Sequence, residues 1–213
     1  MLVLSSPSGG GKSPIARHLL AGREDVVYSI SATTRGRREG EVDGQHYFFL
    51  SRAEFEQRVA ADAFLEWAEY GGSLYGTLRT EVETGLASGR HVVLDIEVQG
   101  AEQLRSRFPN AVHVFVLPPS AGELVQRLRN RNTEDDAALR RRFAIASREL
   151  DMAERYDFVV VNDDLVEAVA NVAAILDVES RRPSRLANLD FVVADLRRGL
   201  AAAADTPRPV DAA

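Results

Sequence analysis

M1-L-V-L-S-S-P-S-G-G-G-K-S-P14 opens the chain with a short apolar run that leads into a glycine-rich loop. The phosphate-binding loop of nucleoside triphosphate enzymes has Gly, four free positions and then Gly-Lys-Ser or Gly-Lys-Thr, between a strand and a helix. Ser6 takes the first glycine position, and Gly11, Lys12 and Ser13 match the end. The stretch predicts a triphosphate-binding loop; the alternative is a glycine-rich turn with a chance Lys-Ser pair.

Each residue type in this loop suits a phosphate group. Glycines let the backbone approach closely, and the helix that follows offers unpaired N–H groups and the positive end of its dipole. Lys12 can reach the terminal phosphates, and the Ser13 hydroxyl can ligate Mg²⁺. We therefore expect ATP to be bound by Ser8, Gly9, Gly10, Gly11, Lys12 and Ser13.

Pro14 stands where a backbone N–H would normally face a phosphate. In the first turn of a helix, proline breaks no internal hydrogen bond, so the fold can accept it. It still removes one donor for the α-phosphate, and it disfavours the helical conformation of Ser13. Our hypothesis is a functional but weakened triphosphate site.

Composition restricts the class of protein. The 213 residues, 45% of them hydrophobic, can bury one substantial core. A net charge of -6 argues against a general nucleic-acid binder. The absence of cysteine excludes disulfides and thiolate zinc sites and is typical of the reducing cytoplasm. No apolar run is long enough to span a bilayer, so we expect no membrane partner.

Apolar runs alternate with helical patterns along most of the chain, which predicts an α/β fold. We expect a parallel β-sheet of the P-loop NTPase type, flanked by helices on both faces. Asp95 follows one such run, at the carboxyl end where open parallel sheets bind ligands, so it can help Ser13 to position Mg²⁺. The expected strands are Leu2–Leu4, Val26–Ile30, His91–Ile96, Ala111–Leu117 and Asp157–Val161.

The expected domain of residues 1–182 has three parts: a core of residues 1–30 and 81–182, an inserted lobe with a small mixed sheet at 31–80, and a helical lid at about 130–142. Residues 183–213 are expected to form a helix and a frayed tail. Leu186, Leu189, Val193, Leu196 and Leu200 form one apolar seam on that helix, which suits packing on its own domain or a homodimer contact. Both a monomer and a homodimer stay open.

Three segments carry a more specific pattern: S31-A-T-T-R-G-R-R-E-G-E-V-D-G-Q-H-Y47, L65-E-W-A-E-Y-G-G-S-L-Y-G-T77 and L94-D-I-E-V-Q-G100. Together with the phosphate loop, they resemble the bacterial-type guanylate kinases from the first strand to about residue 180. The resemblance implies Mg²⁺-dependent phosphoryl transfer from ATP to GMP, within purine nucleotide metabolism. The lobe at 31–80 would then be the GMP-binding lobe.

The resemblance also implies roles for individual residues. Guanine would be read by Glu66, Ser31, Thr77 and Glu97, where Glu97 replaces the aspartate of the family and lengthens the side chain by one methylene. A carboxylate can accept from both neighbouring N–H groups of guanine, whereas adenine presents an acceptor there, so AMP should be rejected. The GMP phosphate would be held by Arg35, Arg38, Tyr47 and Tyr75. Standing alone, the arginine run would favour a solvated charged loop, and the matching tyrosines reverse that preference. Position alone would equally suit an outward-facing Glu66 on an edge strand.

Arginines and an asparagine complete the implied site. Arg131 and Arg142 match lid arginines that close over the transferring phosphate and, with Lys12 and Arg35, form the expected catalytic set. Asn162 matches a segment near the adenine, although Asn162-Asp-Asp164 is equally suited to cap a helix. Two other functions stay open: a guanylate-kinase-like binding module without catalysis, and a related kinase that acts on a phosphorylated sugar.

Overall fold

The structure is a computed structural model and describes residues 1–130 and 136–204. The chain divides into two compact units, Met1–Ala173 and Ala174–Ala213. The expected boundary between residues 182 and 183 remains a prediction. None of the helices in the described part combines the length and the apolar character needed to cross a membrane.

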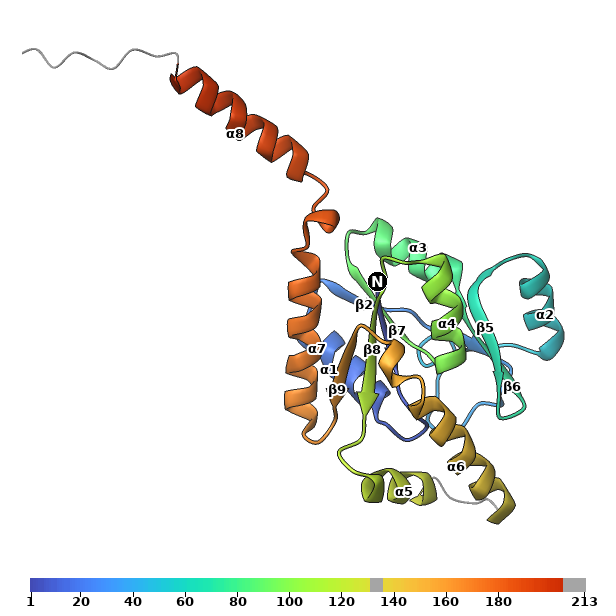
Figure 1. Ribbon diagram of the computed structural model, residues 1–213. Coiled ribbons are helices and arrows are strands. Elements are labelled where there is room, and N and C mark those ends of the chain that lie inside the picture. Colours follow the sequence, from blue (N-terminus) through green and yellow to red (C-terminus); the bar gives the residue numbers. More distant parts are fainter. Residues whose placement is uncertain (131–135, 205–213) are drawn as a thin grey trace, which may run out of the picture. The chain divides into compact units, whose positions relative to one another are not determined.

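A five-stranded sheet with the order β2-β7-β1-β8-β9 forms the centre of the first unit, and all of its strand pairs are parallel (Figure 1). This confirms the expected parallel α/β core. Because the strands run in one direction, their carboxyl ends share one edge of the sheet. The strands are β1 (Leu2–Ser5), β2 (Val26–Tyr28), β7 (His91–Asp95), β8 (Val112–Leu117) and β9 (Phe158–Val161).

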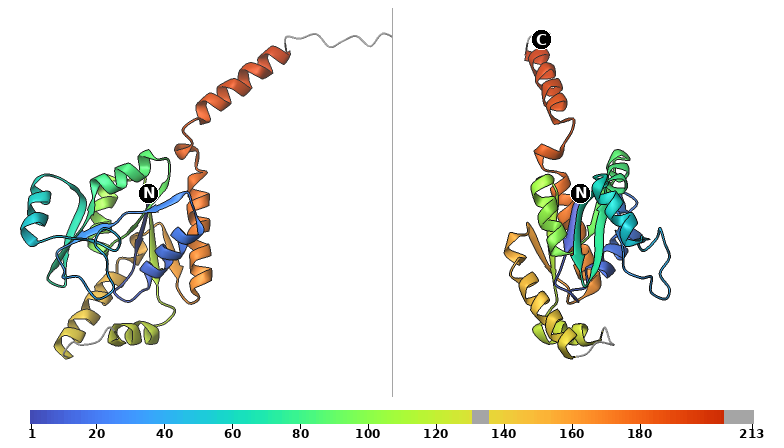
Figure 2. Two further views of the ribbon diagram at one scale, coloured as in Figure 1. Left: turned by 180° about the vertical axis from the view of Figure 1, so that it is seen from behind. Right: turned by 90° about the vertical axis from the view of Figure 1, so that its right-hand side faces the viewer.

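Helices cover both faces of this sheet, as expected. On one face, Val3 and Leu94 belong to a buried cluster with residues of α3 and α4. Successive strand residues alternate, so Leu2 and Leu4 point to the other face; α1 contacts β1, β2 and β7. Figure 1 shows α4 in front of the sheet, and the view from behind in Figure 2 shows α1. The helices are α1 (Lys12–Gly22), α3 (Arg79–Ala87), α4 (Val98–Arg107), α5 (Ala121–Asn130), α6 (Asp136–Leu150) and α7 (Leu165–Ser180), with a 3-10 turn at Ala153–Arg155.

The inserted lobe is a second, four-stranded sheet with the order β4-β3-β6-β5. It is mixed, as expected, because β3 pairs parallel with β4 and antiparallel with β6. Gly71 and Gly72 connect β5 to β6 with φ values of 58 and 79°, which suits a tight hairpin turn. The elements are β3 (Ser31–Thr33), β4 (Phe48–Phe49), α2 (Arg52–Ala60), β5 (Phe64–Tyr70) and β6 (Ser73–Leu78).

The lobe has its own small core. Phe55 of α2 is fully buried and stacks on Phe64, with 4.4 Å between the ring centroids. Ser51 caps α2, and its backbone N–H donates to Glu54 in a capping box. The lobe therefore has a core of its own, and Leu65 of β5 also packs in the core of the five-stranded sheet.

Two further expectations concern the lid and the C-terminal segment. Helices α5 and α6 flank the predicted lid hairpin, and residues 131–135 between them lie outside the described residues. The helix expected after Pro183 is confirmed as α8 (Leu189–Ala204), preceded by a 3-10 turn at Pro183–Arg185. The expected frayed tail was residues 201–213; residues 201–204 are instead helical, as the end of α8, and residues 205–213 lie outside the described residues.

His113 on β8 is a buried imidazole. The residue is 1% exposed, and neither ring nitrogen has a hydrogen-bond partner among residues 1–130 and 136–204. Burial, reinforced by the charge of Arg105, lowers its pKa to about 4, and Asp157 and Glu102 oppose this shift. The imidazole is therefore neutral in the folded protein at neutral pH.

This histidine should make the fold sensitive to acid. An unfolded histidine titrates near pH 6.5, so between about pH 6.5 and about pH 4 the unfolded state binds a proton that the folded state excludes. The free energy of unfolding should fall by about 3 kcal/mol across this interval because of His113. Urea unfolding should show His113→Leu gaining stability relative to the wild type on acidification. Parallel pH curves for the two proteins would contradict this assignment.

Candidate active site

A cleft in the first unit is lined from three places: the glycine-rich loop, the segment after β7, and the small sheet with the loop between β3 and β4. Of the residues singled out in the sequence, it brings together Lys12, Ser13, Ser31, Arg35, Arg38, Tyr47, Glu66, Tyr75, Asp95 and Glu97. The residues that do not line it are Ser8, Gly9, Gly10, Gly11, Thr77, Arg142 and Asn162. Arg131 lies outside the described residues.

The glycines of the loop are required by its geometry. Gly9 and Gly11 have φ values of 88 and 92°, in the region that favours glycine. A Cβ at Gly10 would lie 2.6 Å from that of Ser6, and one at Gly11 would overlap the amide nitrogen of Asn162. Ser6 fits at the first glycine position, where its hydroxyl donates to the Pro7 carbonyl at 3.0 Å.

Pro14 lies in the first turn of α1, which begins at Lys12. The helix forms around it, as expected from the orphan N–H groups of a first turn. The Pro14 carbonyl lies 2.9 Å from Nδ1 of His18. The fold therefore accepts the proline, and its effect on ATP remains a prediction.

Lys12 is held by two carboxylates from the carboxyl end of β7. Its Nζ lies 3.4 Å from Asp95 Oδ1 and donates to Glu97 Oε1 at 3.1 Å. Burial by itself would lower the pKa of Lys12, but the charges of Glu97 and Asp95 outweigh it, and the pKa is raised. Lys12 is therefore a charged ammonium inside the cleft. The other oxygen of Glu97, Oε2, is buried without a hydrogen-bond partner in the described part of the chain.

Glu66 is a buried carboxyl that faces the cleft, not an outward residue of an edge strand. It is 4% exposed, and its Oε1 accepts a hydrogen bond from the Thr77 hydroxyl at 2.6 Å. A β-bulge places it there: Phe64 pairs with Leu78 and Glu66 with Thr77, so Leu65 is the extra residue. Burial raises the pKa of Glu66 to about 7, and the charge of Glu97 adds to the shift while Thr77 opposes it.

Gly100 leaves room for this carboxyl. A Cβ at this position would overlap Oε2 of Glu66 and lie 2.8 Å from its Cδ. Gly100 ends the segment Leu94–Gly100, and no role was predicted for it. Gly100 lies within α4, where glycine costs about 1 kcal/mol relative to alanine, so a glycine there indicates a close approach.

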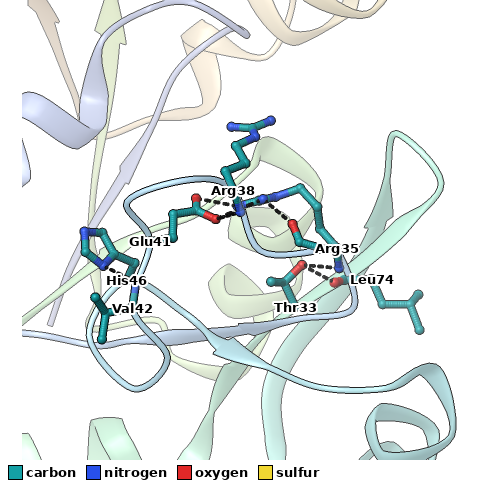
Figure 3. A network of polar contacts seen from close by, with 8 residues as sticks. Thr33, Arg35, Arg38, Glu41, Val42, His46 and Leu74 are labelled. Carbon is teal, nitrogen blue, oxygen red and sulfur yellow. Dashed lines mark hydrogen bonds and ion pairs between the residues drawn. The ribbon is translucent and has the colours of Figure 1, made fainter.

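The loop between β3 and β4 brings arginine and tyrosine together. The guanidinium of Arg35 lies 5.5 Å from the ring centroid of Tyr47, and the rings of Tyr47 and Tyr75 are 6.1 Å apart. Arg35 also forms an ion pair with Glu41 at 2.7 Å, which the sequence analysis did not anticipate (Figure 3). The side chain of Arg38 is turned away from Glu41 in Figure 3.

Three side chains distant in sequence support the glycine-rich loop. Asn162 donates to the Gly10 carbonyl at 3.2 Å, and Asp164 accepts from the Glu167 N–H, so Asp164 and not Asn162 caps α7. Glu149 of α6 accepts from the Ser8 N–H at 2.8 Å. Arg127 of α5 reaches the Gly10 carbonyl at 3.5 Å. No local pattern marks Glu149 or Arg127, because their partners lie more than a hundred residues away.

Arg142 of the predicted lid belongs to α6. Its Nη1 donates to the Leu128 carbonyl at 3.0 Å, which ties α6 to α5. Its expected contact with a transferring phosphate therefore remains a prediction.

Comparison with known proteins extends the likeness from motifs to nearly the whole chain. The model of the family described as guanylate kinase matches residues 1–179. The guanylate kinase of Desulfitobacterium hafniense is 46% identical over 185 residues, 87% of this chain and 92% of that protein. The guanylate kinase of Rhodopseudomonas palustris is 46% identical over 201 residues, 94% of this chain and 92% of that protein.

A solved structure supports the same family. The crystal structure of guanylate kinase from Anaplasma phagocytophilum superposes with a TM-score of 0.77 at 33% identity, over 92% of this chain and 93% of that one. The resemblance inferred from the three segments is thereby confirmed. With its parallel sheet, glycine-rich loop and small mixed sheet, this chain belongs to the guanylate kinase family.

Proposed function

We propose that this chain transfers a phosphoryl group from ATP to GMP, with Mg²⁺, to give ADP and GDP. The observation that carries the proposal is the buried Glu66 carboxyl, which accepts a hydrogen bond from Thr77 and lines the same cleft as Lys12 and Arg35. The glycine-rich loop would bind ATP, the phosphoryl donor. The Glu66 carboxyl would bind the guanine of GMP, the phosphoryl acceptor.

Guanine recognition follows from the chemistry of Glu66. The ring N–H and exocyclic amine of guanine are adjacent donors that one carboxylate can accept together. They would stabilise the ionised form of the Glu66 carboxyl, which burial destabilises. The Ser31 hydroxyl, which lines the cleft, can donate to the guanine carbonyl, and Thr77, whose hydroxyl already donates to Glu66, would hold the carboxyl in place. Glu97, with one buried oxygen unpartnered in the described part of the chain, is the remaining candidate for the amine.

The acceptor phosphate suits the loop between β3 and β4. Arg35 and Arg38 offer guanidinium groups, and Tyr47 and Tyr75 offer phenols, all lining the cleft. Such a cradle holds a phosphate in place while it attacks. No general base is needed, because the GMP phosphate is already an anionic nucleophile at neutral pH.

Donor binding falls to the glycine-rich loop. Lys12 would exchange its contacts with Asp95 and Glu97 for the terminal phosphates of ATP, and backbone N–H groups from Gly9 to Ser13 would cradle them. Asn162 supports this loop in our proposal through its hydrogen bond to Gly10. Arg142 and Arg131 would add positive charge at the transferring group as the lid closes.

The residues present fit a magnesium ion. Ser13 and Asp95 line the same cleft and offer oxygen ligands. The described residues contain no group of three or more His, Cys, Asp or Glu side chains suited to a metal. Mg²⁺ is compatible with that, because it is commonly held by one or two protein oxygens together with substrate phosphates and water. When bound, it would screen the charge on those phosphates.

The proposal extends to the setting of the enzyme. We propose a cytoplasmic enzyme of purine nucleotide metabolism that acts on small molecules, without nucleic-acid or membrane partners, as a monomer or homodimer. The net charge of -6 and the absence of cysteine support this setting.

The first test is ADP formation from ATP and Mg²⁺ with GMP as acceptor and AMP as control. We expect kcat/KM for GMP to exceed that for AMP by about 1,000-fold or more, because adenine would leave the buried Glu66 without its partners. GMP binding without turnover would favour the non-catalytic binding module. Turnover only with a phosphorylated sugar would favour the sugar-phosphate kinase.

Gly100→Ala tests the placement of the Glu66 carboxyl. The added Cβ would overlap it, so KM for GMP should rise by about tenfold or more while KM for ATP stays unchanged. Alanine is the better helix former, so the backbone is not destabilised. Gly22→Ala, at a helical position with open space, is the matched control. An unchanged KM for GMP in Gly100→Ala would show that the carboxyl does not lie at this position in the working enzyme.

Pro14→Thr tests the missing donor of the phosphate loop. The restored N–H should lower KM for ATP by about tenfold and leave KM for GMP unchanged, since a hydrogen bond to a charged group contributes about 1.5–3 kcal/mol. Pro14→Ala restores the same N–H without a hydroxyl and should act alike. An equal or higher KM for ATP in both variants would reject the hypothesis of a weakened site.

A further inference from the structure

The loop between β3 and β4 carries the phosphate-binding arginines but has little apolar core. Residues 36–40 are exposed, and polar contacts anchor the ends of the loop. The Arg35 N–H donates to the Thr33 hydroxyl at 3.1 Å, and the Phe49 N–H donates to Asp43 at 2.8 Å. Hydrogen bonds and ion pairs must therefore set the positions of the arginine side chains.

Glu41 is the acidic residue around which this loop closes. The Glu41 N–H donates to the Arg38 carbonyl at 3.2 Å, and Gly40 between them has a φ of 80°, which a tight turn of this kind requires. The turn brings the Glu41 side chain back toward Arg35. That side chain is 16% exposed, whereas Glu39 and Val42 on either side are exposed residues.

The Glu41 carboxylate accepts three hydrogen bonds from its own loop. Oε1 accepts from Arg35 Nη2 at 2.7 Å, and Oε2 accepts from Arg35 Nη1 at 3.1 Å. Oε2 also accepts from the Arg38 backbone N–H at 2.7 Å, as Figure 3 shows. The hydrogen bond from Arg35 lowers the pKa of Glu41, so the carboxylate stays ionised at neutral pH.

This bidentate contact leaves a defined part of Arg35 for another anion. A guanidinium group has five N–H donors in one plane. Nη1 donates to the Gly36 carbonyl at 2.6 Å and to Glu41, and Nη2 donates to Glu41. The side edge formed by Nε and the second N–H of Nη2 is not used by Glu41 or Gly36. A phosphate can bind that edge in a second bidentate contact without breaking the first.

Neighbouring rings keep the guanidinium plane in place. Its carbon lies 5.5 Å from the ring centroid of Tyr47 and 5.8 Å from that of Phe49. Tyr75 also lies close to Arg35 and, after Glu41, contributes to its raised pKa. Tyr47 and Tyr75 are the phenols assigned above to the same phosphate, so the free edge of Arg35 and these hydroxyls are parts of one cradle.

A carboxylate in a phosphate cradle could instead be a plug that GMP displaces. The contacts argue against displacement, because removing Glu41 would leave the Arg38 N–H and two N–H groups of Arg35 without their acceptor. Glu41 is thus part of the loop itself and not a substitute for the ligand.

We propose that Glu41 is a positioning residue for the acceptor phosphate: it binds the end of the Arg35 guanidinium so that the side edge is presented to the phosphate of GMP. The inference rests on the proposed function and adds a residue to it. Its expected contribution is to GMP binding and alignment and not to ATP binding.

The test is steady-state kinetics of Glu41→Ala in the full chain, with Glu39→Ala as the matched control on the same exposed turn. We expect KM for GMP to rise by about tenfold to a hundredfold in Glu41→Ala, because GMP binding is weakened. KM for ATP and the melting temperature should stay close to those of the wild type, and Glu39→Ala should resemble the wild type throughout. Glu41→Gln, which retains one acceptor oxygen, should be intermediate and serves if Glu41→Ala does not fold.

A double-mutant cycle separates positioning from other roles. In an Arg35→Ala background, Glu41→Ala should cause little further loss in kcat/KM for GMP, because Glu41 acts through Arg35. An equal loss in both backgrounds would overturn the proposal, and so would a lower KM for GMP, which indicates a plug. Parallel rises in both KM values with a lower melting temperature in Glu41→Ala and Glu41→Gln would reduce Glu41 to a structural role.

Direct GMP binding keeps this test distinct from that of the function. If the wild type binds GMP but does not phosphorylate it, the proposed function fails, and calorimetric titration of the same variants with GMP still decides the role of Glu41. A dissociation constant for GMP that is unchanged in Glu41→Ala would then overturn the inference.

Discussion

The ion pairs of the partly buried Lys12 ammonium with Asp95 and Glu97 are the interactions on which the site depends. Burying one charge is costly unless opposite charges lie close, and here the two carboxylates keep the lysine charged. The contact is possible because β1 and β7 pair in parallel with Leu4 beside Asp95, so both strands end at one edge. The glycine-rich loop follows one strand, and the acidic segment follows the other.

On the small sheet the buried ionisable group is a carboxyl, that of Glu66. Glu66 has a pKa of about 7 because burial disfavours its charge. Its place depends on features of three segments: the bulge at Leu65, the Thr77 hydroxyl and the missing side chain of Gly100. Burial still disfavours the ionised carboxylate, and adjacent hydrogen-bond donors such as those of a guanine edge would stabilise it.

Polar contacts between distant segments connect the glycine-rich loop to the helices around it. Glu149 of α6 accepts from Ser8, and Asn162 after β9 donates to Gly10. Arg142 joins α6 to α5 through the Leu128 carbonyl. The two helices that flank the predicted lid are therefore bonded to each other and, through Glu149, to the loop that would bind ATP. The backbone of that loop is held by side chains that have no role in the pattern used to recognise it.

By itself, the sequence determined the parallel α/β core, the inserted mixed sheet and the family. Apolar runs and glycine spacing reflect local conformation and burial, which neighbouring residues in the chain specify. Only the tertiary structure decided which groups meet: Lys12 with Glu97, Glu66 with Gly100, Arg35 with Glu41, and Ser8 with Glu149. Such pairs depend on strand register, on a bulge and on a turn with a positive φ. Electrostatic interactions depend on distance in space, which cannot be read from the separation of two residues in the sequence.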